Sequence, residues 1–410
     1  MAMSRTPLLR PTLIPGLPRY WRGPDELQLG LDPAHAVVLR LPDPRTAKVL
    51  DLLDGDRSER AVLIRAAELG VPPDESRALL DLLHQAGLVL PAARLLPATM
   101  PAVSRARLSG EAAALALTAA AAPVRRTGDR AASAFFTSES SKDSTSEGGG
   151  DRASESGGDR ADGGDLSPAG ILQRRQRAKV VLSGRGRLGA PIAVALAEAG
   201  VGHVYPDLVG SVGAGEVAGG PLGAGDAGSP RRSAVATAVM RAAPGTKVHG
   251  VRRSPATVVV QLAHDEPVAV VAAAHAARRQ PHLAVTVRDG AAVIGPFVPA
   301  GGAPCLHCVD LHRRDRDAGW PSGPATAVPG AEPCAVATLL AATAYATAEI
   351  LAHLDGRVPE TLGAAVQISS PGRLRRRTWP PHPDCDCRRR ARSFTGPSPH
   401  KPNSTMRRAE

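Results

Sequence analysis

Residues 179–189, KVVLSGRGRLG, decide the fold of the larger part of this chain. Lys179–Ser183 is typical of a buried strand, and an apolar helix follows at Pro191–Ala199. Three glycines separate them: Gly184, Gly186 and Gly189. Their spacing suits the tight turn, the close backbone approach and the close helix–strand packing of a dinucleotide-type turn, and the start of the helix favours an anion. The segment predicts a Rossmann-like βα unit, which either binds a nucleotide or keeps the fold without one.

The region around this unit, residues 166–392, alternates strand-like and helix-like runs, which indicates an α/β domain. A strand is expected at Thr257–Ala263 and a long apolar helix at Ala335–Leu354. Between them, Arg288-Asp289-Gly290 is typical of a hairpin turn that links strands at 283–287 and 292–298.

Composition limits the classes of partner. The chain has 410 residues, a net charge of +11 and a pI near 10.2, values that ordinarily suggest nucleic acid or another anionic partner. The charge is local, because residues 373–392 carry eight arginines against two aspartates, whereas residues 1–95 carry twelve basic and twelve acidic side chains. Prolines break the start of the chain before a signal sequence forms, and the apolar stretch 112–122 is too short to cross a bilayer. We expect a cytoplasmic protein that has no membrane partner, and we do not expect nucleic acid to be its partner.

The N-terminal region, residues 1–95, predicts a small winged-helix-like α+β module. Strands are expected at Pro18–Trp21, Glu26–Leu29 and Ala36–Leu41. Three helices follow, one from Pro44 to Gly55 with Asp43 as its cap, one from Ser58 to Gly70, and one from Asp74 to Ala86. Such a module binds DNA or peptide. The third helix carries three acids against Arg77 alone, which would repel phosphates, so peptide binding is the better interpretation.

Two further segments lack the composition of a folded unit. Residues 126–165 are rich in Ser, Gly, Asp and Arg and cannot bury enough apolar surface to offset their ordering entropy, so a disordered insert is expected there. Residues 96–125 connect the N-terminal module to this insert, and residues 393–410 are expected to form a disordered tail.

Four of the five cysteines indicate a metal site. Cys305 and Cys308 have C-x-x-C spacing, and Cys385 and Cys387 have C-x-C spacing. Zinc binds four thiolates tetrahedrally, and the 76 residues between the pairs mean that the metal would join distant segments. The alternative is four reduced or disulfide-linked cysteines, and His307 or His382 are candidates to replace one thiolate.

These motifs resemble those of the ThiF/HesA/MoeB family, which is related to ubiquitin-activating enzymes. Gly184–Gly189, Gly200–Val204 and Cys305–Cys308 come in that family's order and spacing, within residues 175–390. The resemblance implies a Rossmann-like domain with a structural zinc site that binds ATP with magnesium and adenylates a C-terminal carboxylate. It also implies the nucleotide contacts: the three glycines, Arg187, Asp207 and Arg231.

Several positions depart from the family pattern. Arg187 stands where a third consecutive glycine is usual, Pro206-Asp207 interrupts the strand that delivers a ribose-binding acid, and Arg231 replaces a lysine. The polar set expected after that strand is missing from the Gly/Ala-rich stretch 210–227. Asp265 resembles the magnesium-binding aspartate, with a solvated acid at a strand end as the alternative. These departures predict weak or no binding of ATP and magnesium.

No catalytic residue follows from the sequence, and Asp265 and Cys334 are the only candidates. Cys334 precedes the long apolar helix, whose dipole would favour a thiolate, but no family motif surrounds it. A small, buried and unreactive cysteine is the simpler interpretation.

Residues 5–92 resemble the PqqD-like domains that recognise leader peptides. Together with a ThiF-like domain whose nucleotide site is degenerate, they resemble the partner proteins of azoline-forming cyclodehydratases. We therefore expect a protein that binds a precursor-peptide leader and presents it to a YcaO-type enzyme, either alone or as a homodimer. The alternatives are an active ThiF-type adenylyltransferase that uses ATP and magnesium, and a nucleic-acid-binding zinc protein.

Overall fold

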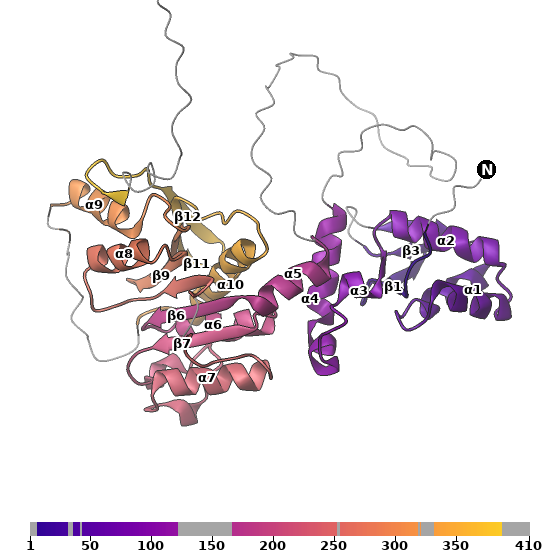
Figure 1. The fold of residues 1–410 in the computed structure, drawn as a ribbon, viewed down its shortest axis with the longest axis horizontal. Coiled ribbons are helices and arrows are strands. Elements are labelled where there is room, and N and C mark those ends of the chain that lie inside the picture. Colours follow the sequence, from indigo (N-terminus) through magenta and orange to yellow (C-terminus); the bar gives the residue numbers. More distant parts are fainter. Residues whose placement is uncertain are drawn as a thin grey trace, which may run out of the picture. The chain divides into compact units, whose positions relative to one another are not determined.

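The computed structural model describes residues 6–31, 36–41, 43–121, 166–251, 255–318, 320 and 332–387 (Figure 1). The segments expected to form an insert at 126–165 and a tail at 393–410 lie outside these residues. By its contacts the chain divides into two compact units, residues 1–99 with 109–170, and residues 100–108 with 171–410. Helices α4 (Ala102–Ala121) and α5 (Pro168–Arg177) each contribute residues to both.

In the first unit, three strands form an antiparallel sheet in the order β2 (Arg19–Trp21), β3 (Glu26–Leu29) and β4 (Val37–Arg40). The three expected strands are therefore confirmed. Sequence reasoning missed β1 (Pro11–Leu13), which is too short to show a periodic pattern and pairs with β5 (Val89–Pro91).

Three helices follow the sheet: η1 (Pro44–Leu52), α1 (Glu59–Glu68) and α2 (Pro73–Gln85). The expected caps are confirmed, because Asp43 accepts a hydrogen bond from the Arg45 N–H at 2.9 Å and Ser58 from the Ala61 N–H at 3.3 Å. The first helix differs from the prediction, since it is a 3₁₀ helix that ends at Leu52. A short helix, α3 (Ala92–Leu95), comes after β5.

The second unit contains a seven-stranded sheet in the order β12-β11-β10-β9-β8-β6-β7. Its strands are β6 (Lys179–Gly184), β7 (His203–Leu208), β8 (Val258–Gln261), β9 (His282–Arg288), β10 (Ala291–Val298), β11 (Ala364–Ser370) and β12 (Arg373–Thr378). Strands β7, β6, β8 and β9 are parallel, whereas β9 to β12 pair antiparallel. The predicted hairpin between β9 and β10 is confirmed, and positive φ angles at Asp289 and Gly290 suit its tight turn.

Helices cover both faces of this sheet. They are α6 (Gly189–Glu198), α7 (Arg231–Ala242), α8 (Val268–Ala277), α9 (Leu306–Arg316) and α10 (Val336–Leu354). Leu283 and Val285 of β9 belong to the main core with α6 and α10, whereas Ala284 packs against the cluster formed by α8 and α9. Since successive strand residues point to opposite faces, α8 and α9 cover the face away from α10.

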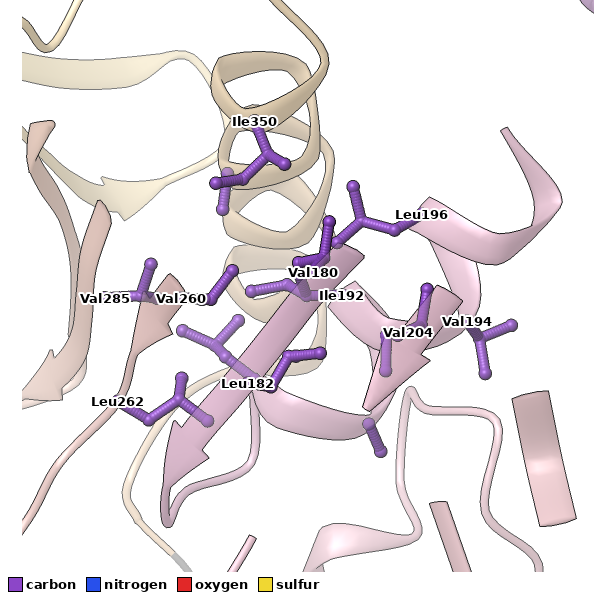
Figure 2. Packing of buried hydrophobic residues seen from close by; sticks show 14 of the residues in the cluster. Val180, Leu182, Ile192, Val194, Leu196, Val204, Val260, Leu262, Val285 and Ile350 are labelled. Carbon is purple, nitrogen blue, oxygen red and sulfur yellow. The ribbon is translucent and has the colours of Figure 1, made fainter. Parts of the chain in front are cut away.

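The main core is aliphatic. Figure 2 shows Val180 and Leu182 of β6 packed among Ile192 of α6, Val260 of β8 and Ile350 of α10. Among the described helices, α10 alone is long and apolar enough to cross a membrane by length and composition. Its buried residues recur at helical spacing, at Leu339, Ala342, Ala346 and Ile350, so burial of this stripe in the core accounts for its apolar character.

The prediction that Pro206 interrupts a strand is wrong. Strand β7 continues through Pro206, which lies opposite Leu182 of β6. β7 is the last strand of the sheet, and two residues earlier the Val204 N–H points outward to the Lys247 carbonyl at 2.9 Å. The Pro206 nitrogen therefore also faces outward, where the described chain has no further strand, and its missing N–H costs no hydrogen bond of the ladder.

A buried ion pair joins the end of α5 to the end of α10. The guanidinium of Arg175 makes two hydrogen bonds of 2.7 Å to the Asp355 carboxylate and a third of 3.1 Å to the Ala199 carbonyl. Both charged side chains are buried. Arg357, which is largely exposed, also donates to the Asp355 carboxylate at 3.2 Å, so removal of Arg175 would leave the buried carboxylate with one weaker partner.

We predict that Arg175→Met lowers the free energy of unfolding by about 3 kcal/mol, because the buried Asp355 carboxylate would keep only the exposed Arg357 as a charged partner. The double variant Arg175→Met/Asp355→Leu removes both charges and should regain most of that loss. Urea denaturation of the three proteins measures both effects, and a single variant as stable as wild type would contradict the prediction.

Candidate functional site

Four thiols from distant segments meet at one end of the second unit. Cys305 precedes α9 and Cys308 lies in its first turn, whereas Cys385 and Cys387 follow β12. The Sγ–Sγ distances are 3.9 Å for Cys305–Cys308, 3.6 Å for Cys305–Cys385 and 3.2 Å for Cys308–Cys387. All four thiols are buried and lie within 4.8 Å of one another.

This geometry fits a metal site. The Sγ distances are far longer than the ~2.05 Å of a disulfide. Four sulfurs held ~2.3 Å from a tetrahedral ion would lie about 3.8 Å apart, close to the separations seen here. Hydrogen bonds among the thiols lower the pKa of Cys308 and raise those of Cys305 and Cys387, so in this cluster one thiolate accepts hydrogen bonds from its neighbours. The four-cysteine group could therefore bind a metal ion.

The two histidines proposed as substitute ligands lie differently. His307 Nδ1 is 3.8 Å from the Sγ of Cys385, beside the thiol cluster. The His382 ring turns to Asp315, with Nε2 2.7 Å from its carboxylate, and Nδ1 accepts the Asp384 N–H at 3.1 Å. His382, Asp315 and His312 form a second group within ligand distance, but the thiol cluster is complete without them.

The glycine-rich turn adopts the backbone that its sequence predicts. Gly184 and Gly186 have φ angles of +113° and +134°, which side chains rarely adopt. A Cβ at Gly184 would lie 2.4 Å from the Ala263 carbonyl oxygen. The third glycine packs against Leu208 and Leu262, where a Cβ would come within 3.0–3.3 Å of their methyl groups. All three glycines are thus required by the backbone and by packing.

A carboxylate of the protein itself lies in this turn. The Arg187 N–H donates to Glu332 Oε2 at 2.9 Å, and a Cβ at Gly186 would lie 3.0 Å from that oxygen. The Arg187 guanidinium reaches the carbonyls of Glu332 and Cys334 at 3.0 and 2.8 Å. Burial raises the pKa of Glu332. Two further N–H groups of the turn bond internally, from Arg185 to Ala263 and from Gly189 to Gly186.

The other residues expected to bind nucleotide also have partners within the protein. Asp265 pairs with Arg185. Arg231 bonds to the Glu216 carboxylate at 2.6 Å and to the Ser211 carbonyl at 2.7 Å. Asp207 accepts hydrogen bonds from Arg232, at 2.5 Å, and from the Tyr205 hydroxyl, at 3.3 Å. The glycine-rich turn, Asp265 and Arg231 thus lie at the carboxyl ends of β6, β7 and β8. Both charged side chains already form ion pairs, Asp265 with Arg185 and Arg231 with Glu216.

Cys334, the other catalytic candidate, is half-buried just before α10. Burial raises its pKa, which disfavours the thiolate form that a nucleophile needs. Glu332 is the residue that sequence reasoning missed, because it lies 145 positions from Arg187 and belongs to no motif.

The fold can be compared with known proteins. The sequence matches no protein-family model and no curated protein. Among solved structures, E. coli MccB with ATP is 15% identical, with a TM-score of 0.53, and the match covers 92% of this chain and 99% of that one. The microcin C7 biosynthetic enzyme MccB in complex with N-formylated MccA is 14% identical, with a TM-score of 0.52 and the same coverage. These likenesses support a ThiF-type fold for this chain.

A pair of neutral histidines lies beside the thiol cluster, in a cavity of about 320 Å³ lined also by Cys305 and Cys387. The rings of His275 and His282 stack with centroids 4.1 Å apart. Burial lowers the pKa of His282 to about 4 and that of His275 to about 3. His282 Nδ1 lies 2.9 Å from the Gln280 carbonyl, and Nε2 is buried without a partner, so protonation would bury an unsatisfied charge.

The lowered pKa of His282 predicts acid sensitivity. Between about pH 6.5 and pH 4 the unfolded chain binds a proton at this position that the folded chain excludes, so stability falls as the pH falls. From pH 7 to 5.5, wild type should lose about 1 kcal/mol more than His282→Leu. Urea denaturation at the two pH values tests this, and equal losses in both proteins would contradict it.

Proposed function

We propose that this chain is a non-adenylating, ThiF-like partner protein that binds the leader of a precursor peptide and presents it to a YcaO-type cyclodehydratase in the cytoplasm. The observation that carries the proposal is the Glu332 carboxylate in the glycine-rich turn. In this proposal the second unit keeps the ThiF-type architecture without its chemistry, and the first unit supplies the peptide-binding surface.

The state of the turn argues against nucleotide chemistry. The Glu332 carboxylate accepts the Arg187 N–H, so a phosphate that binds here would have to displace it. The Arg187 guanidinium holds the same segment in place through the Glu332 and Cys334 carbonyls. If the carboxylate stayed in the turn, it would repel the phosphate, because both groups are negatively charged. Magnesium would compete with Arg185 for Asp265. The active adenylyltransferase remains the second candidate, because the fold is shared with MccB, for which a structure with ATP exists.

The first unit offers a surface suited to an extended peptide. Strand β2 is an edge strand whose residues are all exposed, and within the described residues it pairs only with β3. Tyr20 and Trp21 on this strand are 43% and 48% exposed. An edge strand can pair with a peptide backbone while exposed aromatic rings contact its side chains. On α2, Arg77 forms an exposed ion pair with Asp74, and the His84 ring bonds to the Val89 carbonyl.

Zinc is the metal that we assign to the four cysteines. Thiolate ligands in a closed tetrahedral set favour zinc over magnesium or calcium, which prefer oxygen. The ion would supply no chemistry at such a closed site. It would fix the start of α9 to the segment after β12, two regions that otherwise lie far apart in the sequence.

We predict that purified protein contains close to one equivalent of zinc and that Cys305→Ala loses the metal together with thermal stability, because metal binding and folding are linked. Cys334→Ala is the matched control and should keep both, since Cys334 is not part of the thiol cluster. Metal analysis and thermal unfolding measure the outcome. Metal-free wild type of unchanged stability in the presence of a chelator would refute the zinc assignment.

We also predict that the full-length protein binds the leader of a precursor peptide encoded beside it. Trp21→Ala should weaken binding by about tenfold, because an exposed aromatic residue at an interface commonly carries about 1–2 kcal/mol of binding energy. Ile64→Ala is the control, since Ile64 is equally exposed but lies on α1. Fluorescence anisotropy with labelled leaders decides the matter. Duplex DNA binding with a steep salt dependence, and no leader binding, would favour a nucleic-acid-binding protein instead.

A further inference from the structure

A strongly basic surface lies in the second unit, away from the glycine-rich turn. It is a pocket of about 410 Å³ lined by five arginines, two tryptophans and two aspartates among other residues. The arginines are Arg288, Arg313, Arg316, Arg375 and Arg377. They come from β9, α9 and β12, three segments that are separate in the sequence. We call this the arginine pocket.

Four of the five arginines contact one of the two tryptophans, and Arg375 is the exception. The guanidiniums of Arg288 and Arg313 lie 5.9 and 5.3 Å from the centre of the Trp320 ring. Those of Arg316 and Arg377 each lie 5.7 Å from the centre of the Trp379 ring. Such cation–π contacts orient a guanidinium but leave most of its N–H donors available. In the part of the chain that the structure describes, none of the five arginines forms an ion pair, although Asp289 and Asp317 line the pocket.

Two of these arginines are charged and partly desolvated, and the carboxylates of Asp310 and, for Arg288, Asp289 offset only part of that cost. Burial, with repulsion from Arg288 as a smaller cause, lowers the pKa of Arg313 to about 10, and burial lowers that of Arg288 as well. Both groups stay charged at neutral pH, so their partial desolvation costs free energy that a bound anion would offset. In addition, the indole N–H of Trp379 is buried without a hydrogen-bond partner.

The shape of the surroundings indicates what kind of anion fits. The pocket adjoins β12, the exposed edge strand of the sheet, which within the described residues pairs only with β11. A neighbouring hollow continues along the same strands and shares Gln367 and Arg375 with the pocket. An extended chain could pair with this edge and place alternate side chains over the arginines.

We infer that the arginine pocket and the adjoining edge of β12 form a docking site for an acidic, extended peptide segment of a partner protein. Arginine binds carboxylates with two parallel hydrogen bonds, and alternate acidic residues on a strand would meet Arg375 and Arg377 in turn. Nucleic acid fits less well, because the tryptophan rings that bases would stack on are already covered by guanidiniums. This inference does not depend on leader binding by the first unit.

A labelled peptide of alternating glutamate and threonine, added to the full-length protein, tests the inference by fluorescence anisotropy. Arg375→Glu should weaken binding by about tenfold or more, because it reverses a charge that contacts the ligand. Arg376→Glu is a matched control: it makes the same change in net charge, but Arg376 lies outside the pocket and donates to the Glu360 carbonyl. That variant should bind within about threefold of wild type, since its side chain points to the opposite face of β12 from Arg375 and Arg377 and acts on the peptide only as a partly screened charge. Zinc content should match wild type in both variants.

Three results would overturn the inference. Equal losses for Arg375→Glu and Arg376→Glu would mean non-specific attraction to net positive charge. Tighter binding of duplex DNA than of the peptide, with the same dependence on Arg375, would assign the site to nucleic acid. Peptide binding seen only after deletion of residues 139–165, a stretch rich in acidic residues, would show that the occupant is this chain's own segment and not a partner.

Discussion

The contact between the Glu332 carboxylate and the glycine-rich turn joins the β6–α6 connection of the second unit to the segment that precedes α10. The turn connects β6 to α6 and has positive φ angles at Gly184 and Gly186. Glu332 accepts that N–H and lies four residues before α10, the helix that fills the core against α6. The Arg187 side chain holds the same segment through two carbonyls. The glycine-rich turn and the Arg187 side chain together thus anchor the segment that leads into α10.

The charged residues near the turn are also paired within the protein. Here Asp265 faces Arg185, and Arg231 faces Glu216 and two backbone carbonyls. The Arg231–Glu216 pair is buried and satisfies charge that would otherwise cost free energy, whereas Asp265 is 68% exposed and its pair with Arg185 lies at the surface. The four thiols at the other end of the unit form a similarly closed set, which suits a structural ion and not a catalytic one.

Local chemistry could be read from the sequence, whereas long-range pairing could not. Gly184 and Gly186 were predictable because only glycine tolerates their backbone, and the cysteine pairs because their spacing suits a metal. Pro206 misled because a proline is compatible with an edge strand, and the edge position of β7 depends on the whole sheet order. The contact of Glu332 with the turn, and the assembly of the arginine pocket from β9, α9 and β12, depend on residues that come together only in the fold. The winged-helix-like arrangement of the first unit and its role in leader binding remain predictions.

The proposal that this chain does not adenylate is tested most directly by ATP–pyrophosphate exchange. Purified, zinc-loaded, full-length protein would be given ATP, magnesium, labelled pyrophosphate and the precursor peptide. If Glu332 and Arg187 close the glycine-rich turn, exchange should stay at the protein-free background, and saturable ATP binding should be absent. Robust exchange that requires the peptide would contradict this conclusion and identify the chain as an active adenylyltransferase.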